Sequence, residues 1–377
     1  MAHNIVKMSY ARSRLWLGIT SVGFWVIAAS VVLFFNADQG GVVAGIGFNQ
    51  PFLAQSFLLI KVLALYVLFS FPFDLVGGWW LPAQHDRHSL SLWEYLSVWL
   101  RGVVVHSLCI YISAILLIMA GGFAGIFGAV IMLLLLFLFL LLMQFKIASC
   151  MARMNSSIVN GRERWSSQDE GFTGGWVGLP GLDMEIQPAS WDLILTPEEL
   201  SAQSLRRIGV VGSGSRFRGI LWAIIFNLVG FVLIANFLVG GLSHVGELIV
   251  TASWFTLWSF FGLLLLPRIS RAGVYEVDAY ALREGVDPEL LISSIRKIDK
   301  LQEDEANRSR QVESVFHPIP SVENRVARIR KGDVVSFGAH HAARNALFLS
   351  WACLGVLSRA VHCNAGRPSV WVVFPSD

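Results

Sequence analysis

The stretch IFGAVIMLLLLFLFLLLMQF, which covers residues 126–145, is 20 residues long and contains no charged side chain. An α-helix of about 20 apolar residues crosses the hydrocarbon core of a bilayer, so this stretch predicts a transmembrane helix. Five other segments, residues 15–35, 52–71, 103–119, 219–238 and 248–266, pass the same test. The sequence therefore predicts a mainly α-helical, polytopic membrane protein with six spans.

A seventh apolar segment, residues 346–356, is only 11 residues long. A segment of this length is more typical of a re-entrant, interfacial or buried helix than of a span. Ser350 and Cys353 within it weaken the apolar signal further. The sequence does not decide whether this segment crosses the membrane, and therefore not on which side the C-terminal end lies.

The composition agrees with a membrane protein and excludes other classes. Of the 377 residues, 55% are hydrophobic and 15% are charged, and the mean hydropathy is +0.60. These values exclude a disordered, collagenous or nucleic-acid-binding chain and make the lipid bilayer the first partner. The chain has four scattered cysteines, which are too few for a disulfide framework or a zinc site of paired CxxC motifs. They are Cys109, Cys150, Cys353 and Cys363.

Basic residues are distributed asymmetrically about the predicted spans. The segments on one side of the membrane hold 26 of the 29 lysines and arginines, and the three loops on the other side hold none. Because basic residues stay on the cytoplasmic side, we expect a cytoplasmic N-terminus, and a bacterial inner membrane fits this pattern. The outer loops are too short for a folded domain. Function is therefore expected in the membrane or in the cytoplasmic regions, residues 146–218 and 267–344.

Local patterns in the cytoplasmic regions predict short strands and two capped helices. Residues 171–194 alternate glycine and proline with short apolar runs, which is typical of a strand-and-turn element. Thr196, Pro197 and Glu199 have the pattern of a capping box, and Asp287 before Pro288 marks a second helix start. The second helix has four residues at helical spacing, Leu291, Ile295, Ile298 and Gln302.

Four stretches occur in the order found in a known family. They are the tryptophan-rich segment 71–102, LTPEEL at 195–200, SRAGVYEVDAYA at 270–281 and FHPIPSVENRVARI at 316–329. In this order they resemble the membrane-embedded zinc metalloendopeptidases of the CAAX prenyl protease and HtpX type. The resemblance implies three regions: an N-terminal membrane region (1–145), a metallopeptidase-like α+β region with two further spans (146–345) and a hydrophobic C-terminal tail (346–377).

The residues that hold zinc in that family have no counterpart in this sequence. The resemblance places the two histidines of the HExxH motif at Arg206 and Val210, its general-base glutamate at Arg207 and the carboxylate ligand at Val274. A zinc site of this kind needs imidazole and carboxylate ligands and a free glutamate. Arginine offers no lone pair, and valine has no donor atom. We therefore expect no catalytic residue, no metal and no cofactor at these positions.

The resemblance also implies that the shape of the old cleft is retained, with arginines that favour an anionic group. The predicted cleft residues are Arg206, Arg207, Asp278, His317 and Arg325. Asp278 and Arg271 are expected to form a pair that positions their helix. His317 is expected either near the old site or, as we favour, in a turn satisfied by local hydrogen bonds.

The leading interpretation is an inactive relative of these peptidases that binds membrane proteins or peptides in a regulatory role. An alternative is an active zinc metalloendopeptidase with other ligands. Three pairs are candidates for another reactive site: His85 with His88, one turn apart if helical, and the adjacent His340 and His341 as metal ligands, and His362 with Cys363 as base and nucleophile. A weaker alternative is a carrier of ions or small molecules, which requires the intramembrane residues Lys61 and Asp74 to line a polar path.

Overall fold

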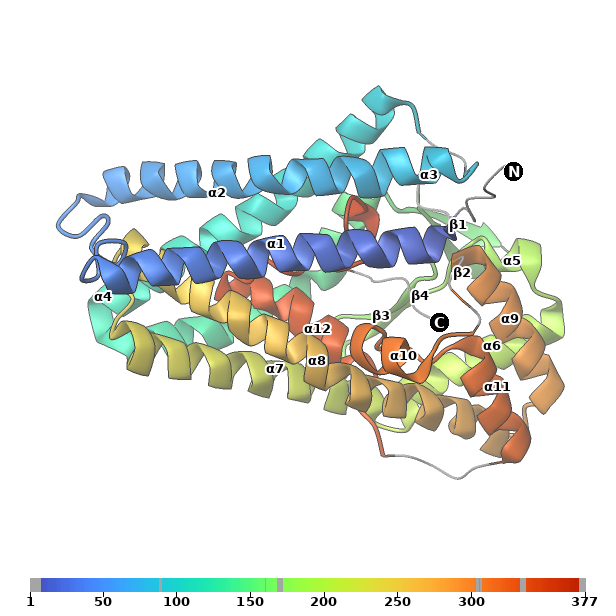
Figure 1. The fold of residues 1–377 in the computed structure, drawn as a ribbon. Helices are drawn as coiled ribbons and strands as arrows, with labels where there is room; N and C mark the ends of the chain where they lie inside the picture. The colour runs from blue at the N-terminus through green and yellow to red at the C-terminus, as the bar shows by residue number, and fades with distance from the viewer. Residues whose placement is uncertain are drawn as a thin grey trace.

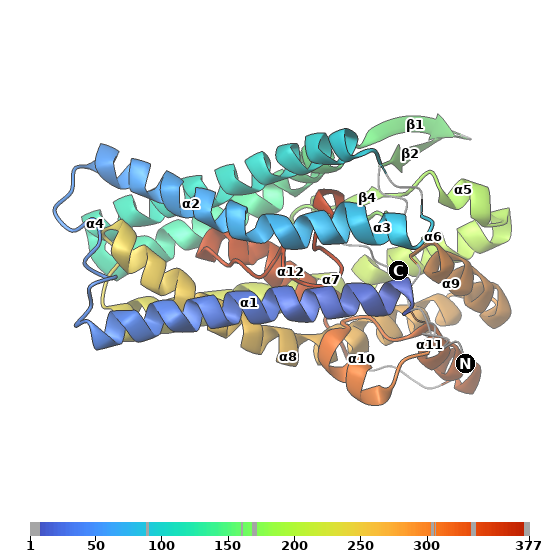
Figure 2. The same cartoon turned by 45° about the horizontal axis from the view of Figure 1, so that its top comes forward.

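The computed structural model describes residues 8–87, 90–159, 161–167, 172–302, 305, 307–332 and 337–372. Within them, five helical stretches are long and apolar enough to cross a membrane. Their main helices are α1 (Tyr10–Asp38), α2 (Phe52–Leu75), α4 (Leu92–Ala152), α7 (Ser215–Leu233) and α8 (Val245–Arg283). Figures 1 and 2 show these helices side by side, with the strands and short helices gathered at one end, the strand end. This arrangement confirms the predicted polytopic helical fold.

The five stretches contain all six predicted segments, because α4 holds both the third and the fourth. The backbone of α4 leaves helical geometry at Ala124 (φ −130°) and Gly125 (φ 58°), within the glycine-rich stretch between these segments. Glycine adopts such a positive φ without steric cost. At the start of α4, the side chains of Ser91 and Glu94 each accept a hydrogen bond from the other residue's backbone N–H, which forms a capping box.

Three of the spanning helices extend beyond the segments predicted from hydropathy. α2 continues through a π-helical turn, η1 (Val76–Trp80), into α3 (Leu81–Gln84), and α7 continues into a second such turn, η2 (Ile234–Val239). α8 is 39 residues long and passes through Pro267 without ending. The sixth span and the helix that carries Val274 and Asp278 are therefore one continuous element.

The strand end contains two antiparallel hairpins. β1 (Asn155–Val159) pairs with β2 (Arg162–Ser166), and β3 (Gly175–Val177) pairs with β4 (Met184–Ile186). The hairpin of β3 and β4, with α5 (Trp191–Ile194) after it, forms the predicted strand-and-turn element; residue 171 of that segment lies outside the described residues. The remaining helices are α6 (Pro197–Gly212), α9 (Pro288–Gln302), α10 (Arg310–Phe316) and α11 (Val322–Lys331).

The predicted helix caps are confirmed. Thr196 and Glu199 form the capping box of α6. Asp287 Oδ1 accepts hydrogen bonds from the backbone N–H groups of Glu289 and Leu290 at 2.9 and 3.0 Å. The predicted inner face of α9 is buried at Leu291, Ile295 and Ile298; the side chain of Gln302 is outside the described part.

The seventh segment forms a short buried helix and not a span. It consists of α12 (Ala342–Leu349) and a 3₁₀ turn, η3 (Ser350–Cys353); a further turn, η4 (Pro368–Val370), follows. Figure 2 shows α12 between the long helices, and the side chains of Trp351 and Trp371 are fully buried. A Cβ added at Gly78 would lie 2.0 Å from the carbonyl oxygen of Gly366, so only glycine permits this approach. The tail (residues 342–372) is thus part of the core of the bundle.

Candidate functional site

The positions that the resemblance assigns to the zinc motif are buried. Arg206, Arg207 and Val210 lie on α6, and their exposed fractions are 1%, 2% and 4%. Val274 on α8 is fully buried. Arg207 and Val210 border a small cavity of about 20 Å³, to which His340 and His341, just before α12, also contribute.

Arg206, Asp278 and Arg325 form one buried ion cluster. Arg206 donates from Nε to Asp278 Oδ1 at 2.6 Å. Arg325 donates from Nε to Oδ2 at 2.9 Å and from Nη2 to Oδ1 at 2.8 Å, which is a bidentate pair. None of the three residues is more than 4% exposed. The cluster therefore joins α6, α8 and α11 at a place where two guanidinium groups share one carboxylate.

Asp278 does not pair with Arg271, which corrects that expectation. Arg271 Nη1 donates instead to the backbone carbonyl oxygens of Glu313 and His317, at 2.7 Å each. The two residues are seven positions apart on one helix, which is a rise of about 10 Å. The guanidinium of Arg271 reaches the neighbouring α10 segment, and Asp278 is satisfied from α6 and α11.

Arg207 is held by the strand element and not directed into an open cleft. Its guanidinium donates to the carbonyl oxygens of Thr173 and Ile186, the latter at 3.0 Å. It lies 3.9 Å from the centre of the Trp191 ring, and its Nη1 is 3.8 Å from a carboxylate oxygen of Glu185. A cation over an aromatic face and two carbonyl acceptors stabilise a buried arginine. Arg207 therefore acts in the packing of α6 against β4 and α5.

His317 lies at the end of α10. Its ring packs edge-on against His362 of the tail, with ring centres 4.9 Å apart. Burial, followed by the neighbouring charges of His362 and Arg308, lowers the pKa of His317 well below its usual range. The imidazole is therefore neutral at physiological pH and borders a second, larger cavity.

The structure does not bring Lys61 and Asp74 together. Lys61 is exposed on the outer face of α2. Asp74 forms a buried ion pair with Arg359 of the tail and accepts hydrogen bonds from Trp99 Nε1 and from the backbone N–H of Gly366, both at 3.0 Å. Asp74 thus fixes the tail inside the bundle.

The other pairs considered from the sequence are separated or incomplete. His85 Nε2 lies 3.5 Å from Ser13 Oγ, and His88 lies outside the described residues. The rings of His340 and His341 are tilted by 43° to each other, with centres 3.8 Å apart. The part of the chain that the structure describes contains no group of three or more His, Cys, Asp or Glu residues placed to hold a metal ion. The arginine and valine side chains at the positions that the resemblance assigns to the zinc motif do not fit a zinc ion.

Sequence reasoning missed Arg14 and Arg359. Both are buried arginines near the membrane-spanning helices, with exposed fractions of 5% and 2%. Arg359 lies in an apolar stretch of the tail, and a buried charge in such a stretch needs a partner. That requirement indicates an acidic partner, and the structure shows that Arg359 forms an ion pair with Asp74.

Comparison with known proteins supports the fold. No protein-family model matches the chain, and no curated protein matches it. Among solved structures, the crystal structure of S. mikatae Ste24p is similar, with a TM-score of 0.67 and 11% sequence identity; the match covers 85% of this chain and 86% of that chain. At this identity the likeness shows the fold alone. The chain therefore shares the polytopic helical membrane fold of Ste24p.

Proposed function

We propose that this chain is a non-catalytic relative of the membrane zinc metalloendopeptidases, with a binding or regulatory role. The observation that carries the proposal is the buried cluster of Arg206, Asp278 and Arg325. In the family pattern, the position of Arg206 belongs to the first zinc-ligating histidine. Here the side chain at that position donates to a carboxylate and has no lone pair for a metal.

Electrostatics supports the same proposal. A divalent cation beside a guanidinium is repelled: for two unit charges 4 Å apart the repulsion is about 4 kcal/mol at an effective dielectric constant of 20. Arg206 and Arg207 are adjacent and both almost fully buried. The packing of Val210 and Val274 supplies no oxygen, nitrogen or sulfur ligand to offset this repulsion.

The binding role would be exercised at a membrane. The five spanning stretches place the chain in a bilayer. From the distribution of basic residues we propose that the N-terminus and the strand end face the cytoplasm, in a bacterial inner membrane. Membrane proteins or peptides that reach this side are the partners we propose.

Elemental analysis of the protein, purified in detergent without a histidine tag, tests the proposal. We expect far less than one zinc per chain. One tightly held zinc per chain would favour the active metalloendopeptidase instead. His340→Ala and His341→Ala would then show whether the small cavity beside Val210 holds the ion, with His85→Ala, His88→Ala and His317→Ala as the comparison variants.

A further inference from the structure

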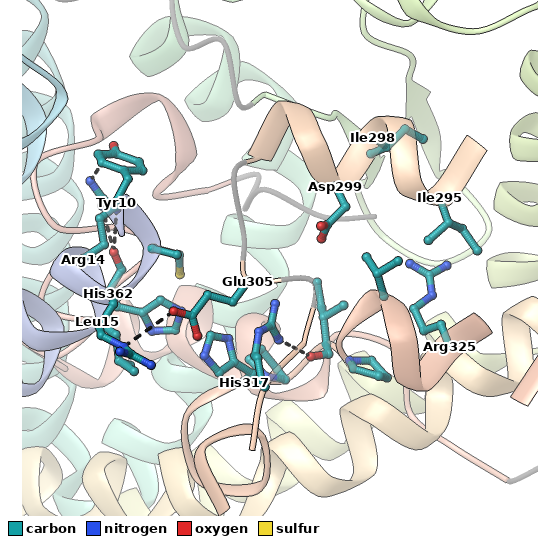
Figure 3. Close-up of a pocket in the computed structure, with 18 of the residues that line it drawn as sticks. Tyr10, Arg14, Leu15, Ile295, Ile298, Asp299, Glu305, His317, Arg325 and His362 are labelled. Atoms are coloured by element: carbon teal, nitrogen blue, oxygen red, sulfur yellow. Dashed lines mark hydrogen bonds and ion pairs between the residues drawn. The ribbon is translucent and has the colours of Figure 1, made fainter. Parts of the chain in front are cut away.

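A second, larger cavity, of about 100 Å³, lies at the strand end. The first turns of α1, helix α9, residues 318–320 and the tail surround it. Figure 3 shows Arg14 and His362 on one side, Arg325 on the other, and Glu305 and His317 between them. Among the described residues that line it, none belongs to the four positions of the lost motif. The cavity is thus separate from the former zinc position, and only Arg325 belongs to both it and the ion cluster.

The lining of this cavity is strongly basic. Its described lining residues include six arginines and two carboxylates, Asp299 and Glu305; one of the arginines, Arg325, is paired with Asp278 outside the lining. The arginines are Arg12, Arg14, Arg308, Arg325, Arg344 and Arg367. Four of them, at positions 14, 308, 325 and 344, are no more than 8% exposed. Buried charges interact with a bound anion through a lower effective dielectric constant than exposed ones.

The charge of Arg14 has no carboxylate partner among the described residues. Its guanidinium donates to the carbonyl oxygens of Gly77 (2.7 Å), His362 (2.8 Å) and Ala365 (3.0 Å), and to the hydroxyl of Tyr10 (3.4 Å). All of these acceptors are neutral. They satisfy the N–H groups but leave the positive charge uncompensated, so this wall of the cavity has a positive potential.

Glu305 is the carboxylate nearest the middle of the cavity in Figure 3. Its Oε1 accepts from Ser9 Oγ at 3.1 Å and lies 3.7 Å from Arg12 Nε. The Arg12 side chain is 60% exposed and that of Glu305 is 29% exposed. Such an open ion pair contributes little to stability and is easily replaced by another anion.

We propose that this cavity binds a phosphate group, carried by an anionic lipid headgroup or by a soluble phosphate ester. Guanidinium groups match the geometry of phosphate oxygens and bind them in a bidentate manner. Glu305 occupies the basic cavity and competes with the ligand. The neutral His317 supplies a hydrogen-bonding group without adding charge. This inference rests on the binding role proposed above but not on the loss of zinc.

Two probes separate the two sources of phosphate. The full chain in detergent is titrated by calorimetry with inorganic pyrophosphate, and in parallel with short-chain phosphatidylglycerol against short-chain phosphatidylcholine. Saturable binding of pyrophosphate supports a soluble ester. Binding of phosphatidylglycerol, without binding of pyrophosphate or phosphatidylcholine, supports a lipid headgroup. Binding of neither anion, or equal binding of phosphatidylcholine, overturns the proposal.

Two variants, one that removes a positive charge and one that removes a negative charge, locate the site. Arg308→Gln removes a buried cation and should weaken binding about tenfold or more. Glu305→Gln removes the competing carboxylate and should tighten binding by about threefold, since a like charge is removed. Arg330→Gln, on the exposed side of α11, is the matched control and should leave the affinity unchanged. If Arg308→Gln does not fold, Glu305→Gln decides: an affinity unchanged or lowered in that variant overturns the site. The zinc content is measured separately, so its result does not depend on this one.

Discussion

Two buried centres of arginine and aspartate, one at the strand end and one in the bundle, compensate their charges differently. At the strand end, Asp278 accepts from both Arg206 and Arg325, so two guanidinium groups share one carboxylate. In the bundle, Asp74 forms an ion pair with Arg359, and the other donors to its side chain among the described residues, Trp99 and Gly366, are neutral. The first centre therefore depends on a carboxylate shared by two cations, whereas in the second one carboxylate pairs with one cation.

The two centres also join different parts of the chain. Asp278 connects α6, α8 and α11, and the first two of these helices carry the positions that the resemblance assigns to the zinc motif. Asp74 connects the end of α2 to the tail, and the guanidinium of Arg359 also lies 4.5 Å from the centre of the Trp371 ring. The strand end is therefore held by a shared charge, while the tail is held by charge together with packing. Removing one partner should therefore have a larger effect at Asp278.

Asp278→Asn should give the largest loss of stability. It removes the carboxylate that Arg206 and Arg325 share, and removing one partner of a buried ion pair costs about 3–5 kcal/mol. Denaturant unfolding in detergent, followed by tryptophan fluorescence, measures the loss. The double variant Asp278→Asn with Arg206→Met also removes one of the two buried guanidinium groups and should recover part of the stability. A loss under about 1 kcal/mol, or no recovery in the double variant, would show that the cluster is not a structural centre.

Arg359→Met should have a smaller and more local effect. Asp74 loses its cation but keeps two neutral donors, so the cost should lie at the lower end of the range for a broken buried pair, about 3 kcal/mol. Hydrogen exchange should increase in residues 350–372 and not in α6. Trp99→Phe, which removes only one neutral donor, is the milder comparison at the same carboxylate. Uniform loss of protection across both centres would show that the two centres are not independent.

The pH dependence tests the region between the two centres, where His317 of the strand end meets His362 of the tail. The pKa of His317 is lowered in the folded protein, chiefly by burial and then by His362, Arg308, Arg271 and Arg344. Below the unfolded pKa of about 6.5, only the unfolded state takes up the proton, so stability is lost as the pH falls and is fully present above that value.

At pH 5.5 this histidine should therefore lower the stability by up to about 1.4 kcal/mol relative to pH 7.5. His317→Gln should reduce the difference between the melting temperatures at the two pH values. His85→Gln, at a histidine for which burial is only partial, is the control. A pH difference that His317→Gln leaves unchanged would assign the effect to other groups.

The sequence predicted what depends on neighbouring residues. The spans follow from runs of apolar residues, and the capping boxes follow from residues three positions apart, as at Thr196 and Glu199. The two charge centres depend on residues far apart: Arg206 lies 72 positions from Asp278, and Arg359 lies 285 positions from Asp74. The partner expected for Asp278 was Arg271 on the same helix, yet helices distant in the sequence supply its actual partners.

Burial of the tail also could not be predicted from local sequence patterns. An 11-residue apolar segment fits an interfacial, a re-entrant or a buried helix equally well, since all three present apolar side chains to an apolar surrounding. These three kinds of helix are distinguished by the space that the other helices leave for the segment. One example is the close approach of Gly366 to Gly78. The basic cavity was missed for the same reason, because α1, α9 and the tail each contribute only part of it.

Arg296→Ala should have the smallest effect on the free energy of unfolding, and it serves as the exposed reference for the two buried centres. Arg296 on α9 and Glu323 on α11 form the same chemical pair as the buried centres, with N and O atoms 3.2 Å apart, but each side chain is 47% exposed. Water and salt screen such a pair, and holding two long side chains in place costs conformational entropy, so the change should be about 0.5 kcal/mol or less. The unfolding assay used for Asp278→Asn measures it at low and high salt. If this exposed pair contributed as much to stability as either buried centre, burial would not be the reason for the large effects. The difference between the Asp278 and Asp74 variants would then have to come from the helices that each aspartate joins, and not from the buried arginine charge that each variant leaves unpaired.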